Sequence, residues 1–561
     1  MGNLLSAGGT TTTVKVYYGD TDGGNVPAAW GASSNLGVKA EGEVTYVMTG
    51  LSSASIYYYR FFAANVYGGV WAGTAVRFTA ASLPALSNVP ARSVRTTTAV
   101  AGADIISTGA VPTTVSVYYG PSDGGTTSSA WNRVLNLGMQ PVGRVSATLT
   151  GLSPGSDCYY RFFAANTAGG VWAGSSEKFT TKTLFDPWGY TKAMQIVITG
   201  YSGVEMLENF PTLVVLSNGS ADVFYYTDML SPPNADLRFV DTDGSELNYE
   251  IDTWNSTDQS FVWVQVPLLY NGAVITCFWG KAGASSPVCT SNGTTWSEGF
   301  LSVHHLSTNY TDGTWVLDSA ADLSSGNFGV WGELVDYGTP YYEADDWQAG
   351  KIGMSIALNS EDTETTEYIA LADGYESFKH GLTFSVWVNE NTVAGAGVWQ
   401  PFIDIDDWGE YMILYDSEGY IDFYTWVDEQ YGWEDDFTAG QWYNTVVTLS
   451  KGGGFTAYQN GVLWWTAGGL TFSSNEYLRT YNYLGWSGWE EWLPGRLDDV
   501  QVADVVRSPE WVKAAYDNQN DPSTFAAYTP AEVPIPEPAA AAAGLVVGCW
   551  LWAVRRRKRG D

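Results

Sequence analysis

The sequence is 561 residues long, which leaves room for three or four domains at roughly 150 residues each. Its 62 glycines and 15% aromatic residues favour an all-β chain over a helical one. A net charge of −34 excludes a nucleic-acid-binding protein, which would present a basic surface, and four cysteines are too few for a disulfide scaffold. We therefore expect an all-β chain of several β-sandwich domains.

An internal repeat fills the first third of the chain. Residues 14–19 (VKVYYG) return as residues 115–120 (VSVYYG), and residues 58–65 (YYRFFAAN) return unchanged as residues 159–166, so both pairs are offset by 101 residues. Apolar and polar residues alternate in each copy, as they do in short sandwich strands. The constant offset indicates a tandem duplication, with copies at residues 1–83 and 84–183.

The second copy contains LSPG at residues 152–155 shortly before its YYRFFAAN segment, and this combination resembles the corner between strands E and F of fibronectin type III domains. The resemblance implies that the Tyr57 hydroxyl of the first copy bonds to upstream backbone. Cys158 stands at the equivalent position of the second copy and cannot make that bond. We expect both copies to act as spacers, with adhesion as the alternative.

The first copy begins late in the repeat. Met1 aligns with Gly102, so the first copy has no counterpart of residues 92–100, which precede this point in the second copy. Residues 1–13 also lack the basic start and apolar run of a secretory signal peptide. We therefore expect the natural chain to begin upstream of Met1.

Residues 184–299 form a third module. An Asp243-Gly244 turn predicts a hairpin between residues 236 and 251. Four short segments of this module resemble a β-sandwich domain of unknown function that precedes LamG-type modules in prokaryotic surface proteins. They are Leu-Arg-Phe at residues 237–239, Tyr-Glu-Ile at 249–251, Trp-Val-Gln-Val-Pro at 263–267 and Trp-Gly at 279–280. Cys277 and Cys289 lie near enough in sequence to suggest a disulfide.

Residues 300–528 form the acidic module, with seven Lys and Arg against thirty-six Asp and Glu, a net of −29. We interpret this charge as a solvated acidic surface. Five segments resemble the LamG-like jelly roll of the concanavalin A-like lectin/glucanase fold. They are FSVWV, QW, YQNG, GRLDDV and a helix that Ser508 caps, at residues 384–388, 441–442, 458–461, 495–500 and 508–518.

The sequence shows no set of catalytic residues in this module. Retaining glycosidases of this fold carry carboxylates at alternate strand positions, which places the reacting pair on one face. Glu343-Ala344-Asp345 begins such a pattern, but no glutamate follows at Trp347 or Gln348. Residues 404–407 (DIDD) contain no glutamate, and the three histidines form no visible triad or metal pair. We therefore expect a protein that is not an enzyme.

Two groups of residues are candidates for ligand contacts. Tryptophans in glycine- and acid-rich stretches can stack on sugar rings, and these are Trp408, Trp433, Trp486, Trp489 and Trp492. Carboxylates supply the hard oxygens that calcium prefers, and the candidates are Asp404, Asp406, Asp407, Glu434, Asp435 and Asp436. Core packing of the tryptophans and solvation of the carboxylates are the alternatives, and no cofactor other than calcium is indicated.

Residues 529–561 form a tail of three parts, in the order Pro536-Glu537-Pro538, sixteen apolar residues at 539–554, and the basic cluster of Arg555, Arg556, Arg557, Lys558 and Arg559. A sixteen-residue helix spans about 24 Å, less than the bilayer core of about 30 Å. The order resembles the PEP-CTERM sorting signal of bacterial surface proteins, which implies an exosortase-type enzyme as a partner. An ordinary tail anchor is the alternative.

We therefore expect an exported protein of the cell surface or extracellular matrix, held in the inner membrane at least transiently by the tail helix. The expected function is glycan or protein binding in adhesion or biofilm, with an extracellular polysaccharide or a surface protein as the ligand. A purely structural spacer and a glycan-processing enzyme are the alternatives.

Overall fold

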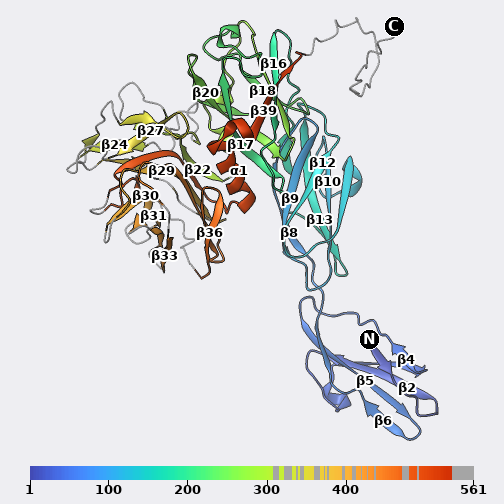
Figure 1. Ribbon diagram of the computed structural model, residues 1–561. Helices are drawn as coiled ribbons and strands as arrows, with labels where there is room; N and C mark the ends of the chain where they lie inside the picture. Colours follow the sequence, from blue (N-terminus) through green and yellow to red (C-terminus); the bar gives the residue numbers. More distant parts are fainter. Residues whose placement is uncertain are drawn as a thin grey trace, which may run out of the picture. The chain divides into compact units, whose positions relative to one another are not determined.

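The computed structural model describes residues 1–533 with gaps at residues 298, 308–314, 317, 321–331, 337–338, 341–345, 359–366, 372, 374, 376–377, 379, 395–397, 407–411, 418–419, 426–427, 435–436, 470–478 and 489–491. Of residues 315–316, 332–336, 339–340 and 428–434 it describes the backbone alone. Strands in several sheets dominate, which confirms the predicted all-β multidomain fold (Figure 1).

The predicted tail helix at residues 539–554 and the sorting-signal residues Pro536, Glu537, Pro538, Arg555, Arg556 and Arg557 lie outside the described residues. Within the part of the chain that the structure describes, no helix has the length and apolar character needed to cross a membrane. The chain divides into two compact units, Met1–Leu184 with Asp243–Ser245 and Phe185–Thr242 with Glu246–Asp561.

The first unit contains the two repeats. The first repeat consists of β1 (Gly2–Leu4), β2 (Thr12–Gly19), the 3-10 turn η1 (Pro27–Ala29), β3 (Ala32–Lys39), β4 (Gly42–Val44), β5 (Ile56–Asn65), β6 (Gly68–Trp71) and β7 (Val76–Thr79). The second consists of β8 (Ala85–Arg92), β9 (Thr98–Ser107), β10 (Thr114–Gly120), η2 (Ser128–Ala130), β11 (Arg133–Met139), β12 (Gly143–Thr150), β13 (Asp157–Asn166), β14 (Gly169–Trp172) and β15 (Glu177–Thr180).

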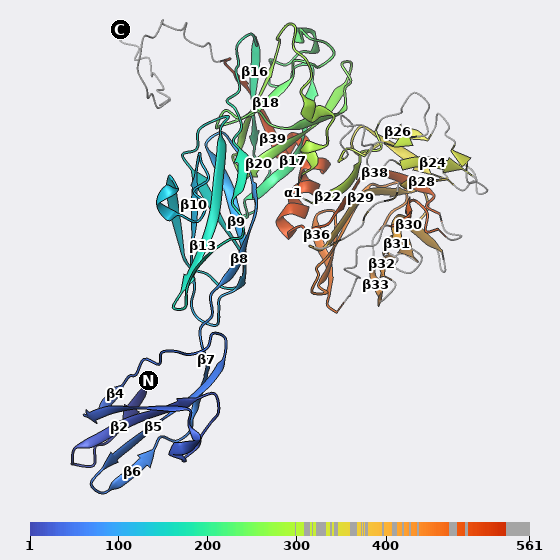
Figure 2. The same cartoon turned by 180° about the vertical axis from the view of Figure 1, so that it is seen from behind.

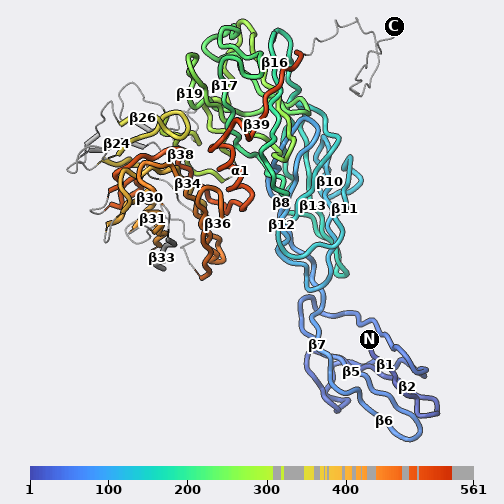
Figure 3. Tube along the Cα trace, viewed as in Figure 1, coloured from blue at the N-terminus to red at the C-terminus, as the bar shows by residue number. Residues whose placement is uncertain are grey.

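Each repeat has a five-stranded sheet of the same order. In the first repeat the order is β3-β2-β5-β6 with β7 beside β5, and in the second it is β11-β10-β13-β14 with β15 beside β13 (Figure 3). The opposing sheets differ, because β12-β9-β8 has three strands and β1-β4 has two. The predicted corner bond is present in the first repeat, where Ser52 N–H donates to the Tyr57 hydroxyl at 2.9 Å. In the second repeat Ser156 N–H donates instead to the Thr181 hydroxyl, also at 2.9 Å.

The third module opens the second unit. Its elements are β16 (Lys192–Ile198), β17 (Leu207–Ser217), η3 (Tyr226–Asp228), β18 (Arg238–Asp241), β19 (Tyr249–Thr253), β20 (Gln259–Leu269), β21 (Val274–Trp279), η4 (Val288–Thr290) and η5 (Thr294–Trp296). They form two sheets, β18-β21-β16-β39 and β17-β20-β19, around a shared core. The last strand of the first sheet, β39 (Ala526–Ala531), comes from the far end of the chain and crosses the boundary at residue 528 that the sequence had suggested.

Of two expectations for this module, the hairpin is confirmed only next to its turn and the disulfide is wrong. The chain turns at Asp243-Gly244, and Gly244 adopts the left-handed φ of 82° that such a turn requires. The two arms of this turn form an antiparallel bridge between Val240 and Glu246, as expected for a hairpin. The hairpin is short, however, because β18 pairs with β21 and β19 pairs with β20 in the opposite sheet. No disulfide joins Cys277 to Cys289, since Cys277 lies fully buried in the core of this module as a thiol.

Two sheets form the jelly roll. One has the order β26-β27-β38-β29-β34-β35-β36 with β22 beside β38. Its strands are β22 (Phe300–His304), β26 (Trp347–Ala349), β27 (Met354–Leu358), β29 (Leu382–Glu390), β34 (Tyr443–Leu449), β35 (Phe455–Gln459), β36 (Val462–Ala467) and β38 (Gly495–Ala503). The predicted Asn460-Gly461 hairpin is confirmed between β35 and β36, with φ values of 52° and 71°.

The other sheet has the order β23-β24-β28-β37-β30-β31-β32-β33 with β25 beside β24 (Figure 2). Its strands are β23 (Trp315–Val316), β24 (Gly332–Asp336), β25 (Thr339–Pro340), β28 (Tyr368–Leu371), β30 (Trp399–Asp406), β31 (Met412–Ser417), β32 (Tyr420–Thr425), β33 (Asp428–Glu434) and β37 (Tyr481–Leu484). Side chains from both sheets form one apolar core, so each sheet has an inner and an outer face.

Helix α1 (Pro509–Asn520) joins the third module to the jelly roll, and α2 (Pro522–Phe525) follows it. Ser508 caps α1 as predicted, with its hydroxyl accepting a hydrogen bond from Trp511 N–H at 3.2 Å. One side of α1 contacts β17, where the Asn518 amide bonds to both backbone groups of Leu213. From another side Gln519 accepts a hydrogen bond from the indole of Trp387 in β29. The two modules therefore share a helix.

Candidate functional site

The candidate site lies on the outer face of the jelly-roll sheet that contains β30. The side chains of Ile403 and Ile405 pack into the core between the sheets. Because successive side chains in a strand point to opposite faces, Asp404 and Asp406 lie on the outer face. Both carboxylates are largely withdrawn from solvent, at 0% and 8% exposure, which is rare for aspartates.

Tyrosines flank the two carboxylates. Strand β37 pairs with β30 so that Tyr483 lies opposite Asp404 and Tyr481 lies opposite Asp406. Residues opposite one another in neighbouring strands point to the same face, so these tyrosine side chains lie beside the aspartates. Exposure rises across the group from Asp404 to Tyr481, which is 36% exposed. The site therefore opens to solvent on the side of Tyr481.

Further aromatic rings extend this face. Tyr368 of β28 lies with its ring centroid 5.5 Å from that of Tyr483 and 4.4 Å from that of Trp486. The rings of Trp486 and Tyr483 are 4.6 Å apart, which closes the cluster. All three rings are half-buried, so part of each is accessible. Contacts of this kind hold aromatic rings at fixed positions.

The acid at the centre of the site is Asp404, whose side chain is fully buried. Among the described residues, neither carboxyl oxygen of Asp404 has a hydrogen-bond partner. Burial raises the pKa of Asp404 well above its ordinary value, and the neighbouring Asp406 raises it further. Burial also raises the pKa of Tyr483 to about 12, with Tyr368 and Asp404 contributing. Asp404 therefore holds a proton readily, and a protonated carboxyl can both donate and accept a hydrogen bond.

This arrangement fits a ligand that is polar at its edge and apolar on its face. A sugar ring has this character, because its hydroxyls exchange hydrogen bonds with a carboxyl while its C–H face stacks on an aromatic ring. A buried polar group without a partner costs free energy, and a ligand that supplies the partner recovers that cost.

The structure brings together part of the predicted tryptophan set. Trp486 and Trp492 form a backbone bridge with each other, and both are half-buried. Trp433 lies in strand β33, opposite Ile421, and its side chain is not described. Trp408 and Trp489 lie outside the described residues.

The predicted calcium set is described only in part. Asp404 and Asp406 belong to β30, Glu434 ends β33 with its side chain not described, and Asp407, Asp435 and Asp436 lie outside the described residues. No group of three or more acidic, histidine or cysteine side chains within the described ranges is arranged to hold a metal ion. A calcium site therefore stays a prediction.

Sequence reasoning missed the tyrosines of this site. Tyr481 and Tyr483 alternate with Asn482 and Leu484, and Leu484 lies in the core. That alternation is the signal for a strand with an aromatic outer face, and it could have been read from the sequence. Tyr368 could not, because its contact with Trp486 joins residues more than a hundred positions apart.

A second polar cluster is largely buried and lies between the two modules of the second unit. His305 stacks on Trp263 of the third module with centroids 5.2 Å apart. Its Nδ1 is 2.9 Å from Asp499 Oδ1, and its Nε2 is 3.8 Å from Glu250 Oε2. Burial lowers the pKa of His305, but Asp252, Asp499 and Glu250 outweigh burial and hold it well above the ordinary value. We interpret this ion cluster as structural, because its charged groups pair with one another.

Asp318 lies near this cluster. Its Oδ1 accepts hydrogen bonds from Val303 N–H and Ala320 N–H, each at 2.9 Å. Burial raises the pKa of Asp318 to about 7 despite these two bonds. The jelly roll therefore carries an acid that titrates near neutral pH as part of its structure.

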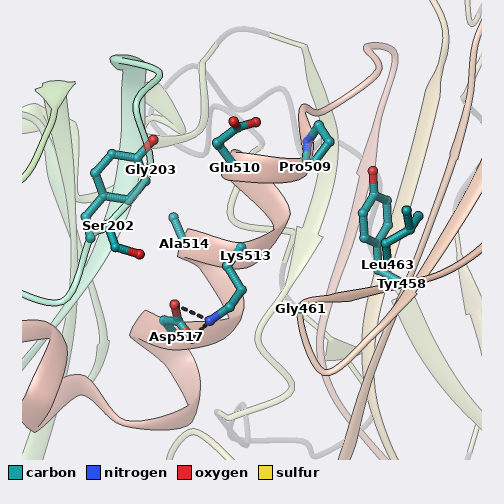
Figure 4. A pocket seen from close by; sticks show the side chains of 11 residues that line it. Ser202, Gly203, Tyr458, Gly461, Leu463, Pro509, Glu510, Lys513, Ala514 and Asp517 are labelled. Atoms are coloured by element: carbon teal, nitrogen blue, oxygen red, sulfur yellow. Dashed lines mark hydrogen bonds and ion pairs between the residues drawn. The ribbon is translucent and has the colours of Figure 1, made fainter.

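A cavity of about 260 Å³ lies beside α1 (Figure 4). Lys513 and Asp517 pair with each other along one turn of the helix, and the Tyr201 hydroxyl donates to the backbone oxygen of Glu205 at 2.7 Å. Lys513, Asp517 and Tyr201 in the lining of this cavity thus have hydrogen-bond partners within the protein. The outer face around Asp404 has the greater unmet hydrogen-bonding capacity.

Comparison with protein families identifies two of the modules. Residues 363–513 match the concanavalin A-like lectin/glucanases superfamily, and residues 234–316 match a domain of unknown function (DUF2341). A search of the curated proteins finds no match to this chain.

Several solved structures are similar to part of the chain. Domain 4 of AbnA, an extracellular GH43 arabinanase from Geobacillus stearothermophilus, in complex with arabinotriose, is 19% identical, with a TM-score of 0.30 over 38% of this chain and 97% of that chain. A structure reported for cell entry of botulinum neurotoxin type C, described as dependent on two ganglioside molecules, is 13% identical, with a TM-score of 0.30 over 39% of this chain and 51% of that chain. A TM-score of 0.30 is too low for either likeness to identify a ligand of this chain.

The chain thus contains a concanavalin A-like domain, and the candidate site lies within the matched residues. A DUF2341 domain precedes it, as the sequence had indicated.

Proposed function

We propose that the jelly roll binds a glycan on the outer face around Asp404. The single observation that carries this proposal is a buried carboxyl, without a hydrogen-bond partner among the residues that the structure describes, beside three half-buried aromatic rings. A protein that did not use Asp404 would gain stability from an apolar residue at this position. Its presence is therefore best explained by a polar ligand.

The setting of this domain supports a role at the cell surface. Its acidic composition suits a soluble outward-facing module, and the tail at residues 529–561 has the order of a sorting signal. We propose an exported protein of the cell surface or matrix, with the two repeats as spacers and the tail as the substrate of an exosortase-type enzyme. Glycan binding would then serve adhesion or matrix assembly.

Glycan-array binding of the purified chain, followed by titration calorimetry with the best ligand, tests the proposal. We expect Tyr483→Ala and Trp486→Ala each to weaken binding at least about tenfold, because a stacked ring contributes of the order of 1.5 kcal/mol. Trp465→Ala is the matched control, because Trp465 is 42% exposed on β36 of the other sheet. Equal losses in all three variants, or no binding by the wild-type chain, would contradict a glycan site here.

Hydrolysis is a second candidate function, because two acids on one strand face, one with a raised pKa, are the pair that glycosidases use. Glu343, which begins the alternative carboxylate pattern, lies outside the described residues. Release of reducing sugar from a bound polysaccharide, lost in Asp404→Asn and in Asp406→Asn, would favour an enzyme over a lectin. Binding without release would favour the lectin.

A further inference from the structure

The cavity beside α1 lies at the junction of the third module and the jelly roll. Its volume is about 260 Å³, and all of its lining residues lie in the described ranges. Three segments of the second unit line it, which are residues 201–203 of the third module, the hairpin between β35 and β36, and the N-terminal part of α1. Figure 4 shows Ser202 and Gly203 on one side of α1 and Tyr458 and Leu463 on the other.

One face of α1 supplies the charged groups of this cavity. Four lining residues have the spacing i, i+3, i+4 and i+7, which places them on one side of a helix, and they are Glu510, Lys513, Ala514 and Asp517. Lys513 Nζ lies 2.6 Å from Asp517 Oδ2, so the charges of this pair balance each other. Within the described part of the chain, the Glu510 carboxylate has no hydrogen bond or ion pair. The lining therefore carries one negative charge in excess, at Glu510.

Tyr458 lines the cavity from strand β35. This residue is only 3% exposed, and its ring packs against Val446 and Val512. Its hydroxyl has no hydrogen-bond partner among the residues that the structure describes. Burial raises the pKa of Tyr458, and Glu510 raises it further, so the hydroxyl lies close to this carboxylate. A buried polar group without a partner costs free energy, and a ligand that supplies the partner recovers that cost.

A hydrogen-bond donor with a positive charge matches these two groups. A primary ammonium has three N–H donors and no acceptor, so it can donate to the Glu510 carboxylate and to the Tyr458 oxygen at the same time. An anion would be repelled by Glu510, and a neutral alcohol would leave the charge of Glu510 unbalanced. The apolar walls at Tyr201, Leu463 and Pro509 suit the methylene groups behind such an ammonium.

We propose that this cavity binds a small primary amine, with the Glu510 carboxylate as its counter-ion and the Tyr458 hydroxyl as a second acceptor. The net charge of −29 in residues 300–528 attracts cations to this module and favours their encounter with the cavity. Because the third module, the jelly roll and α1 all line the cavity, the bound amine contacts all three. Its binding therefore stabilises the junction of the two modules, and it does not depend on glycan binding at Asp404.

Titration calorimetry of the full chain with n-pentylamine tests the proposal. We expect saturable binding of one amine per chain at about 0.15 M salt, where interactions between exposed charges are largely screened. The neutral analogue 1-pentanol has the same carbon chain without the charge and should not bind. Glucosamine, titrated in the same way, identifies the source of the ammonium. Tighter binding of n-pentylamine assigns the cavity to alkylamines, and tighter binding of glucosamine assigns it to amino sugars.

Two variants each remove one acceptor. Glu510→Gln should weaken amine binding at least about tenfold, because it removes the counter-ion and keeps the shape of the side chain. Tyr458→Phe should weaken it about fivefold, because it removes the hydroxyl and keeps the ring against Val446 and Val512. Asp258→Asn is the matched control, because Asp258 is an exposed carboxylate of the same unit that does not line the cavity. This control should bind the amine as the wild type does.

Hydrogen exchange by mass spectrometry locates the bound amine and verifies that each variant is folded. The amine should slow exchange in peptides that cover residues 201–203, 458–463 and 509–517, and it should leave β30 and β37 unchanged. Equal affinity of the wild type, Glu510→Gln and Tyr458→Phe for n-pentylamine would overturn the proposal. So would the absence of saturable binding by the wild type, equal binding of 1-pentanol, or protection confined to β30 and β37.

Discussion

Replacement of Asp404 by leucine should stabilise the jelly roll and remove ligand binding. The native side chain is fully buried with no hydrogen-bond partner for either carboxyl oxygen among the described residues. An unsatisfied buried polar group costs about 1–3 kcal/mol, and a leucine at the same position carries no such cost. We therefore expect Asp404→Leu to raise the free energy of local unfolding around β30 and β37 by about 1–3 kcal/mol. A substitution that stabilises the fold and abolishes binding marks a residue kept for function.

The pH dependence of stability provides a second test of the role of Asp404. Because the folded-state pKa of Asp404 is raised, its contribution to stability is fully present below the ordinary pKa and is lost as the pH rises towards the folded-state pKa. Over that window the wild-type chain should lose up to about 1.4 kcal/mol per pH unit from this one group. Asp404→Asn keeps the shape without the titration, so it should remove this slope.

Hydrogen exchange by mass spectrometry measures both effects in peptides that cover β30 and β37, after correction for the pH dependence of intrinsic exchange. Peptides from the first repeat serve as the internal control, because they do not contain the site. A loss of protection in Asp404→Leu with unchanged glycan binding would refute the reasoning. An unchanged pH slope in Asp404→Asn would refute the assignment of the titration to this residue.

Three further predictions concern the same unit. His305→Ala should lower the free energy of unfolding by about 3–5 kcal/mol, because it leaves buried carboxylates without their cation, and hydrogen exchange in β22 should become faster. In the wild type this stabilisation should be lost as the pH rises through the raised pKa of His305. Equal exchange in both chains would contradict the prediction. Asp318→Asn keeps the oxygen that accepts the two hydrogen bonds. It should stabilise the jelly roll at pH values above about 7, where Asp318 is ionised, but not at pH 4. Urea unfolding at the two pH values measures this difference. Gly461→Ala should destabilise the jelly roll by about 1–3 kcal/mol, because a residue with a Cβ is strained at φ 71° and the Cβ would lie 2.8 Å from Tyr516. A melting temperature equal to that of the wild type would contradict this prediction.

Local patterns in the sequence were enough for much of the fold. The duplication, the Asn460-Gly461 hairpin and the cap at Ser508 all depend on residues close together in the chain, and all three are confirmed. The hairpin expected at Asp243-Gly244 extends only to the bridge between Val240 and Glu246, because the partners of β18 and β19 lie in different sheets. The residues of a turn determine where the chain reverses, whereas the pairing of the strands depends on which apolar faces the core buries.

The sequence also indicated part of the candidate site. It singled out Asp404, Asp406 and Trp486 by residue type, but Asp404 was interpreted as a calcium ligand and its neighbours Tyr483 and Tyr368 were not identified. Residue type shows which chemistry a side chain can perform. It does not show that Asp404 is buried without a partner, since that depends on which strands lie beside β30.

The sequence by itself determined the class of the chain: its composition gave an all-β protein, its repeat gave two equal modules, and its motifs gave a concanavalin A-like domain behind a domain of unknown function. These features can be predicted because the alternation of apolar and polar residues, the turn residues and the repeat spacing are visible in the sequence itself. Only the tertiary structure decided that α1 and β39 tie the jelly roll to the preceding module, and that a buried acid lies beside an aromatic cluster. These features depend on contacts between residues that are distant in the chain. Such contacts form only when the strands pair and their apolar side chains become buried.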